Sequence, residues 1–300
     1  MPSSKVVYSA LPEAVSREWG LLFDGAELVT GGMNSVTTML HLPGSRVFAK
    51  WVPESGAEDL LRGAVVAQSM SANGIRAGNP IPTLGGALSA PLLGGQLLLM
   101  EEVAGNALGS SEGDLWDWGV TLAHIHAVAT SKHRADFFPW LREVGTDPAR
   151  ESWVRSAVEQ VVAEYDELPS LTWAQLHSDP GPEAFRRNTD GNIGVVDWAG
   201  STQGPVLYDL ASAIMYSGNE RAGARVVEGY QSVGLIPDLE VKTYLPTFRR
   251  FRAAVQAAYF SERIHQANLT GMQDQAENLG GLSDSRLLLR EAGMTSSSDA

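Results

Sequence analysis

Residues 176–198 read LHSDPGPEAFRRNTDGNIGVVDW, and this stretch decides how the rest of the chain is interpreted. Its first part ends at Asp179 and runs at once into Pro-Gly-Pro, which excludes a helix and favours a rigid, irregular loop. The part that follows has the pattern of a β-hairpin, because an Asp-Gly turn signal separates two short segments of strand character. The stretch therefore predicts one aspartate on a loop and a second, Asp197, at the end of the hairpin.

A hairpin of this size is expected to return Asp197 close to Asp179, so that the two carboxylates share one site. Each of them alone is an ordinary loop or strand-end acid. Together they suit phosphoryl transfer, which needs one carboxylate to orient or deprotonate an acceptor hydroxyl and acidic ligands for the Mg²⁺ that neutralises the phosphates. Asp179 fits the first role and Asp197 fits the second.

Three short sequences combine with this hairpin into a wider pattern. They are His-Ser-Asp ending at Asp179, Val-Asp-Trp around Asp197, and Tyr-Asp-Leu-Ala around Asp209. The combination resembles the C-terminal-lobe signature of the aminoglycoside phosphotransferase family, whose members phosphorylate hydroxyl groups of small molecules. The resemblance implies that Asp179 is the catalytic base, that Asp197 binds magnesium, and that Asp209 holds the site together from a helix.

The same resemblance implies the fold class, an α+β protein-kinase-like fold of two lobes. Residues 1–102 would form the N-terminal nucleotide-binding lobe with a small antiparallel sheet, and residues 103–300 a mainly helical C-terminal lobe with the catalytic loop and the acceptor site. The patterns agree with this division, because strand-like segments and turns prevail up to residue 100 and helical spacing of apolar residues prevails from residue 114 onward.

The expected metal site departs from the family pattern at Ala184. The family usually has an asparagine there as a second metal ligand, and alanine has no side-chain atom that binds a metal. Glu183, immediately before it, offers a hard anionic oxygen that suits Mg²⁺. We therefore expect Asp197 and Glu183 to be the metal ligands. For Glu183, the alternatives are a solvated loop acid and a site with one firmly held metal.

A glycine-containing loop precedes the strand expected over residues 36–42. In the kinase-like lobe that the resemblance implies, this loop would cover the nucleotide phosphates. Its candidate residues are Gly31, Gly32, Asn34 and Ser35. Two adjacent glycines do not make the glycine-rich kinase pattern, however, and a plain β-turn explains them equally well.

Lys50 lies in the apolar strand expected over residues 46–52, where a lysine must either reach solvent or meet an anion. The resemblance implies that it binds the α- and β-phosphates of the nucleotide. Kinase-like folds also pair this lysine with a glutamate on the next helix, here expected over residues 56–73, but the middle of that helix has no acid. Glu58, near the start of the helix, is the expected partner.

The sequence changes from an apolar strand to a polar linker at Glu101. In the family this segment is the hinge between the lobes, and backbone groups around Glu101 and Val103 would bind the edge of the adenine. A simple connection between domains is the alternative interpretation of the same residues.

The composition limits the partners. The 300 residues carry 22 basic and 35 acidic side chains, a formal charge of −13, which argues against nucleic acid because that binding needs clustered Lys and Arg. An acidic surface is compatible with a cationic small substrate and equally with ordinary solubility. The chain has no cysteine, no signal-peptide pattern and no apolar run of about 18 residues, so we expect a cytoplasmic protein that does not bind membranes. A homodimer is compatible with the sequence.

The activity expected from the resemblance is phosphorylation of a small-molecule hydroxyl with MgATP or MgGTP. An antibiotic of the aminoglycoside, nucleoside or peptide type is the first acceptor by family precedent, and its phosphorylation would confer resistance. The alternatives are a small-metabolite kinase for homoserine or a sugar and, because of Ala184 and the missing helix glutamate, a degenerate kinase fold that only binds a ligand. Conceivable acceptor contacts on the C-terminal helices are Tyr216, Tyr259, Glu262 and Arg263.

Overall fold

The computed structural model describes residues 3–29, 34–269, 272 and 274–294. The chain folds into two compact units. The first contains Met1–Ala107 and Glu183–Ser201, and the second contains Leu108–Pro182 and Thr202–Ala300. The hairpin after Asp179 thus belongs to the same compact unit as the N-terminal part of the chain.

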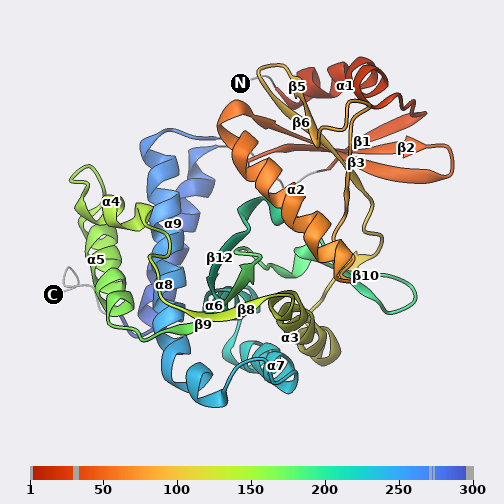
Figure 1. Ribbon diagram of the computed structural model, residues 1–300. Helices are drawn as coiled ribbons and strands as arrows, with labels where there is room; N and C mark the ends of the chain where they lie inside the picture. The colour runs from red at the N-terminus through yellow and green to blue at the C-terminus, as the bar shows by residue number, and fades with distance from the viewer. Residues whose placement is uncertain (1–2, 30–33, 270–271, 273, 295–300) are drawn as a thin grey trace. The chain divides into compact units, whose positions relative to one another are not determined.

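The first unit is built on an antiparallel sheet with the strand order β1-β2-β3-β6-β4, in which β5 also pairs with β6 (Figure 1). Its elements are α1 (Ser4–Trp19), β1 (Gly25–Val29), β2 (Val36–Leu42), β3 (Ser45–Pro53), η1 (Glu54–Gly56), α2 (Ala57–Ala72), β4 (Pro80–Ile81), β5 (Ser89–Leu92), β6 (Gly95–Glu101) and β7 (Asn106–Ala107). The α+β fold class and the antiparallel N-terminal sheet predicted from the sequence are confirmed.

The two helices of this unit cover opposite faces of the sheet (Figure 1). Successive side chains of a strand point to opposite faces, so Leu97 and Leu99 of β6 pack in the buried cluster beneath α1, while Leu98 packs with Leu60 and Ala64 of α2. Burial of each such leucine stabilises the fold by about 1.5–3 kcal/mol. The sheet is therefore held between α1 and α2.

The hairpin of residues 183–201 adds a second, three-stranded sheet to the first unit. Its strands β10 (Phe185–Arg187) and β11 (Ile193–Val195) pair antiparallel, as the sequence predicts, and β7 pairs with β10. The Arg186 guanidinium also donates a hydrogen bond to the Gly105 carbonyl oxygen (2.8 Å). The short helices η2 (Pro182–Ala184) and η3 (Trp198–Gly200) flank the hairpin.

The second unit is mainly helical, with a three-stranded sheet of order β12-β9-β8. Its elements are α3 (Glu112–Ala127), β8 (Thr130–His133), α4 (Trp140–Thr146), α5 (Ser152–Asp166), β9 (Leu171–Leu176), β12 (Thr202–Pro205), α6 (Val206–Tyr216), α7 (Glu220–Ser232), α8 (Asp238–His265) and α9 (Gln275–Glu291). Its core contains stacked and edge-packed rings from distant segments, among them Phe137, Tyr208 and Phe251.

In the second unit, the segment of β12 pairs with β9. Helix α8 runs without a break through Pro246. Helix α9 packs on α8, with Gly281 directly against the ring of Phe260.

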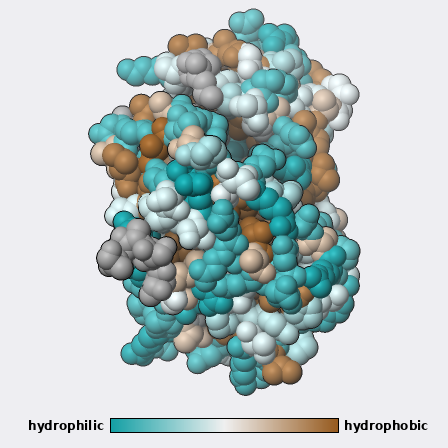
Figure 2. Space-filling model, turned by 90° about the vertical axis from the view of Figure 1, so that its left-hand side faces the viewer, coloured by the Kyte–Doolittle hydropathy of each residue, from teal (hydrophilic) through white to brown (hydrophobic). Residues whose placement is uncertain are grey.

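Among the described residues, no helix is long and apolar enough to cross a membrane. Figure 2 shows a face of the molecule on which hydrophilic residues predominate and hydrophobic residues are scattered. Such a surface agrees with the strongly negative formal charge of the chain.

Candidate active site

Lys50 lies in the middle of β3, and strand alternation decides which way it points. Its neighbours Ala49 and Trp51 belong to the buried cluster beneath α1, so Lys50 points to the opposite face, on which α2 lies. The Lys50 side chain is 12% exposed, and its Nζ atom lies 2.5 Å from Oδ1 of Asp197. Two residues that are 147 positions apart in the sequence thus form an ion pair within the first unit.

Asp197 lies between β11 and η3 with a φ of 66°, in the left-handed region that few residues other than glycine adopt. Such a conformation persists only where the surrounding structure holds it. The carboxylate is 64% exposed. Asp197 therefore combines a fixed backbone with a carboxylate that solvent and ligands can reach.

Glu58 does not pair with Lys50 in this structure. It lies in the first turn of α2, where it is exposed and 3.6 Å from the guanidinium of Arg62, one turn along the same helix. Arg62 also forms an ion pair with Asp59. The acid that meets Lys50 comes from the hairpin instead, in the form of Asp197.

The expected second metal ligand, Glu183, is exposed in η2, and Ala184 beside it is buried. Within the described ranges, no cluster of three or more His, Asp or Glu side chains could hold a metal ion. Mg²⁺ commonly binds one or two carboxylates together with substrate phosphates and water, so a carboxylate such as Asp197 suits it when a nucleotide supplies the other oxygens. Asp197 already binds a cation, the Lys50 ammonium, which shows that its carboxylate accepts positive charge.

Of the residues expected to cover the nucleotide phosphates, Gly31 and Gly32 lie outside the described residues. Asn34 is exposed and Ser35 is half-buried, and both immediately precede β2. They belong to the same unit as Lys50 and Asp197.

The predicted hinge residues line a pocket of about 260 Å³ in the first unit. Its walls come from the end of α2, the segment 74–79 and the residues Glu101, Glu102 and Val103. The Glu101 backbone N–H already donates to the Asn79 carbonyl oxygen (2.8 Å). That donor is therefore used within the unit and is not free for a ligand.

Asp179 lies in the second unit, on the loop after β9. Its carboxylate is 66% exposed, and Oδ1 accepts a hydrogen bond from the hydroxyl of Tyr216, the last residue of α6. The Nη2 atom of Arg252, from α8, lies 3.4 Å from the same oxygen. The closeness of Asp179 to Asp197 that the hairpin predicts stays a prediction, because the two residues belong to different units.

Asp209 fixes the loop that carries Asp179, as the resemblance implied. Its carboxylate, which is buried, accepts hydrogen bonds from the backbone N–H groups of His177 (2.7 Å) and Ser178 (2.9 Å). Ser178 has a φ of 73°, so these bonds hold a conformation that a serine rarely adopts.

A buried histidine extends this network. The Nε2 atom of His126 lies 3.1 Å from Oδ2 of Asp209, and its Nδ1 atom lies 2.8 Å from the hydroxyl of Tyr230. All three side chains are buried. Because burial raises the pKa of Tyr230 well above its usual value, its phenol stays neutral and keeps this hydrogen bond. His126 of α3, Asp209 of α6 and Tyr230 of α7 thus join the three helices through buried hydrogen bonds next to the loop.

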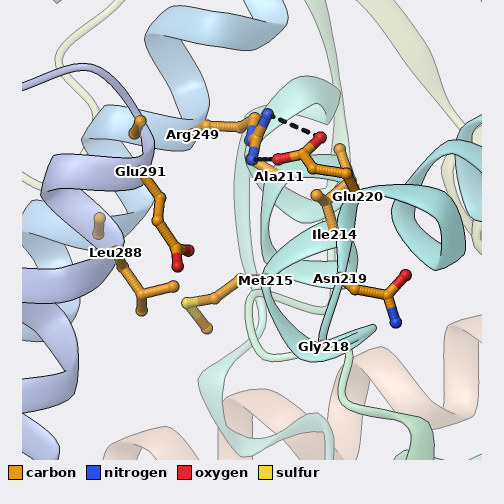
Figure 3. Close-up of a pocket in the computed structure, with 11 residues that line it drawn as sticks. Ala211, Ile214, Met215, Gly218, Asn219, Glu220, Arg249, Leu288 and Glu291 are labelled. Atoms are coloured by element: carbon orange, nitrogen blue, oxygen red, sulfur yellow. Dashed lines mark hydrogen bonds and ion pairs between the residues drawn. The ribbon is translucent and has the colours of Figure 1, made fainter.

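A pocket of about 500 Å³ lies within the second unit among α6, α7, α8 and α9 (Figure 3). It is lined by Ala211, Ile214, Met215, Gly218, Asn219, Glu220, Arg249, Ala253, Leu288, Glu291 and Ala292. Figure 3 shows the ion pair between Glu220 and Arg249 on one side and the Glu291 side chain pointing into the pocket. The pocket therefore offers an apolar floor and acidic groups.

The other conceivable acceptor contacts on α8 face protein groups. Arg263 is buried and donates to the Asn278 side chain (2.9 Å). Glu262 forms an ion pair with Arg150. Of the residues considered on the C-terminal helices, it is Tyr216 that the structure places at Asp179.

Arg252 is the residue at Asp179 that the sequence analysis missed. It lies four residues after Phe248 and three before Val255, and both of these are buried, so Arg252 belongs to the stripe of α8 that faces the core. An arginine on an otherwise apolar stripe must meet an acceptor inside the protein. The sequence therefore indicated that Arg252 meets an acceptor inside the protein, but it did not indicate that this acceptor is Asp179.

The fold is that of the protein-kinase-like phosphotransferases. A sequence model described as the phosphotransferase enzyme family matches residues 26–242, well over half of the chain. The chain belongs to this family, and it is a phosphotransferase with an alcohol group as acceptor. A search of curated protein sequences finds no match.

Solved structures show the same fold at low sequence identity. A spectinomycin phosphotransferase in complex with ADP and spectinomycin is 15% identical, with a TM-score of 0.68 and coverage of 95% of this chain and 98% of the other. The choline kinase from Streptococcus pneumoniae is 16% identical, with a TM-score of 0.72 and coverage of 95% and 99%. An amicoumacin kinase in complex with AMP-PNP and Ca²⁺ is 13% identical, with a TM-score of 0.69 and coverage of 98% and 94%.

Proposed function

We propose that this protein transfers the γ-phosphoryl group of MgATP or MgGTP to a hydroxyl of an antibiotic and so confers resistance to it. The observation that best supports the phosphotransfer site is the ion pair between Lys50 and Asp197, because it joins the two residues that the family resemblance assigns to the nucleotide phosphates and to the metal. In the reaction, a bond forms between the acceptor oxygen and the γ-phosphorus, and the bond to the bridging oxygen breaks. The nucleoside diphosphate leaves, and the hydroxyl proton goes to Asp179.

We assign the nucleotide side of the site to the first unit. Lys50 would bind phosphate oxygens, and Asp197, with Glu183 as the candidate second ligand, would hold Mg²⁺. Asn34 and Ser35, together with Gly31 and Gly32 before them, would cover the phosphates, and backbone groups near Glu101 and Val103 would bind the base. Magnesium supplies positive charge that offsets the charge on the phosphates.

The acceptor side is proposed to be the 500 Å³ pocket of the second unit, which lies along the same helix α6 that ends at Tyr216. The Glu291 carboxylate would attract an amine, and the apolar floor would bind the carbon skeleton. The size suits a compound with several rings better than a two-carbon alcohol. An aminoglycoside, nucleoside or peptide antibiotic with an amino group therefore fits better than a sugar.

A second candidate function is that of a small-metabolite kinase, because a choline kinase is among the similar structures. Choline combines a cation with a hydroxyl, and the Glu291 carboxylate of the same pocket would also attract that cation. Homoserine or a sugar remains a candidate of the same kind. The third hypothesis, a degenerate kinase fold that only binds a ligand, rested on Ala184 and on the missing helix glutamate. The second reason is weakened, because Asp197 supplies the acid that Lys50 was expected to meet on α2.

A phosphate-transfer screen by mass spectrometry tests the proposal. The purified protein is incubated with MgATP or MgGTP and a panel of aminoglycoside, nucleoside and peptide antibiotics, choline, homoserine and simple sugars. A mass gain of one phosphoryl group on an antibiotic supports the proposal, and gain on a metabolite alone assigns the second function. No gain on any compound, with either nucleotide, contradicts both. Cell fractionation of the native host tests the cytoplasmic location proposed from the sequence.

A further inference from the structure

The two oxygens of the Asp179 carboxylate have different surroundings. Within the described part of the chain, the hydrogen bonds to this side chain go to Oδ1, from the Tyr216 hydroxyl and from Nη2 of Arg252. The side chain is nonetheless 66% exposed. One oxygen is therefore bound by the protein, and the other is left for a ligand.

Arg252 is placed to hold Asp179 and not to bind a ligand itself. Its side chain is only 8% exposed. Its Nε donates to Ser212 Oγ (3.0 Å) and its Nη1 donates to Gln256 Oε1 (3.2 Å), while Nη2 reaches both Tyr216 and Asp179. Every nitrogen of the guanidinium is thus bound to a protein group, which fixes its orientation.

Tyr216 completes the arrangement as a hydrogen-bond donor. Burial raises the pKa of the Tyr216 phenol above its usual value, and the carboxylate of Asp179 raises it further, whereas Arg252 lowers it only in part. The phenol is therefore protonated at neutral pH. Its hydroxyl accepts from Nη2 of Arg252 (3.0 Å) and donates to Oδ1 of Asp179. Arg252, Tyr216 and Asp179 form one hydrogen-bonded triangle.

We propose that Arg252 and Tyr216 are positioning residues, which bind Oδ1 of Asp179 and thereby present Oδ2 to the acceptor hydroxyl. The inference rests on the proposed function, because it assigns a task to a carboxylate that receives the acceptor's proton. A cation that is fixed beside the carboxylate stops it from rotating. An aspartate on a loop would otherwise sample several rotamers, only some of which face the acceptor.

The test compares Arg252→Met and Tyr216→Phe with wild type, using the acceptor that the phosphate-transfer screen identifies, or release of phosphate to water if it identifies none. Loss of a charge-assisted hydrogen bond is expected to lower kcat by roughly tenfold to a hundredfold. The KM for the nucleotide should stay within about twofold, because both residues bind the carboxylate that is proposed to act on the acceptor. Arg252→Lys, which keeps the charge, should recover part of the loss.

Matched controls separate positioning from stability. Arg250→Met removes another arginine from the same helix, one that forms an ion pair with Glu164, and Tyr165→Phe removes a hydroxyl that donates to the Ala135 carbonyl oxygen (2.8 Å). Both should leave kcat unchanged even where they lower the melting temperature. The inference is overturned if Arg252→Met and Tyr216→Phe keep wild-type kcat, or if the controls lose as much. If the wild-type protein transfers phosphate to no acceptor, water included, the proposed function is wrong. The inference about Arg252 and Tyr216 is then wrong as well, because it rests on that function.

Discussion

Gly63 of α2 lies so close to the backbone of Trp198 that a Cβ atom on Gly63 would be 2.6 Å from the Trp198 carbonyl oxygen. The same Cβ would be 2.8 Å from Cα of Ala199. These are the residues that directly follow Asp197. The helix therefore touches the segment that follows Asp197, the proposed metal ligand, and it can do so only because residue 63 has no side chain.

Gly63→Ala should destabilise the protein, although alanine normally favours a helix. The added methyl group meets backbone atoms that cannot rotate away, which costs about 1–3 kcal/mol of the free energy of unfolding. Gly280→Ala is the matched control, because a Cβ at Gly280 in α9 meets nothing within 4 Å. Gly280→Ala should raise the free energy of unfolding by about 0.5–1 kcal/mol. Urea unfolding measures both, and the account of Gly63 is wrong if the two variants behave alike.

Lys50→Met should weaken nucleotide binding. The variant removes the ammonium that meets Asp197 and that is proposed to bind phosphate oxygens, so the Kd for MgATP is expected to rise roughly tenfold to a hundredfold. Isothermal titration calorimetry gives this constant directly. Lys5→Met, which removes an exposed lysine of α1, serves as control and should leave it unchanged. An unaltered Kd in Lys50→Met would remove Lys50 from the nucleotide site.

Glu183→Gln decides whether this exposed acid is a metal ligand. If it is, the Mg²⁺ concentration that gives half-maximal turnover should rise about tenfold, because a charged oxygen is replaced by a neutral one. Glu54→Gln, an exposed acid of η1 in the same unit, is the comparison. Equal Mg²⁺ dependence in both variants would make Glu183 a solvated loop residue.

Alkaline pH should destabilise the protein through its buried tyrosines. Burial raises the pKa of Tyr208 and Tyr216 above the value of about 10 that tyrosine has in an unfolded chain. Below pH ~10 both states keep the protons; above it the unfolded state ionises first, so the free energy of unfolding falls as pH rises. Tyr216→Phe should flatten this fall by about 1.4 kcal/mol per pH unit. Urea unfolding between pH 8 and pH ~11 measures the slopes, and identical slopes would contradict the buried, protonated state of Tyr216.

Local sequence patterns were enough to predict much of the secondary structure. The strands expected over residues 36–42 and 46–52 agree with β2 and β3 to within about one residue at each end. Helix α9 was missed because its buried stripe is half polar. The stripe consists of Asn278, Leu282, Ser285 and Leu289. Gly281 within it packs directly on the ring of Phe260, so tertiary contacts override a weak helix signal.

The sequence located the candidate acids more readily than their partners. Asp209 was expected to hold the catalytic loop, and its bonds to His177 and Ser178 do so. The partner of Lys50 was sought on the neighbouring helix, whereas the structure supplies it from Asp197. Such a pairing depends on how a hairpin packs against a sheet, and neither spacing nor propensity encodes that packing locally.

In the proposed reaction, Asp179 acts on the acceptor while the first unit binds the nucleotide. This division is tested by measuring turnover and nucleotide affinity side by side in wild type and Asp179→Ala. We expect Asp179→Ala to lose at least about a hundredfold in kcat, as a lost proton acceptor implies, and to bind MgATP with an unchanged Kd. An Asp179→Ala variant that turns over at the wild-type rate would show that Asp179 does not act on the acceptor.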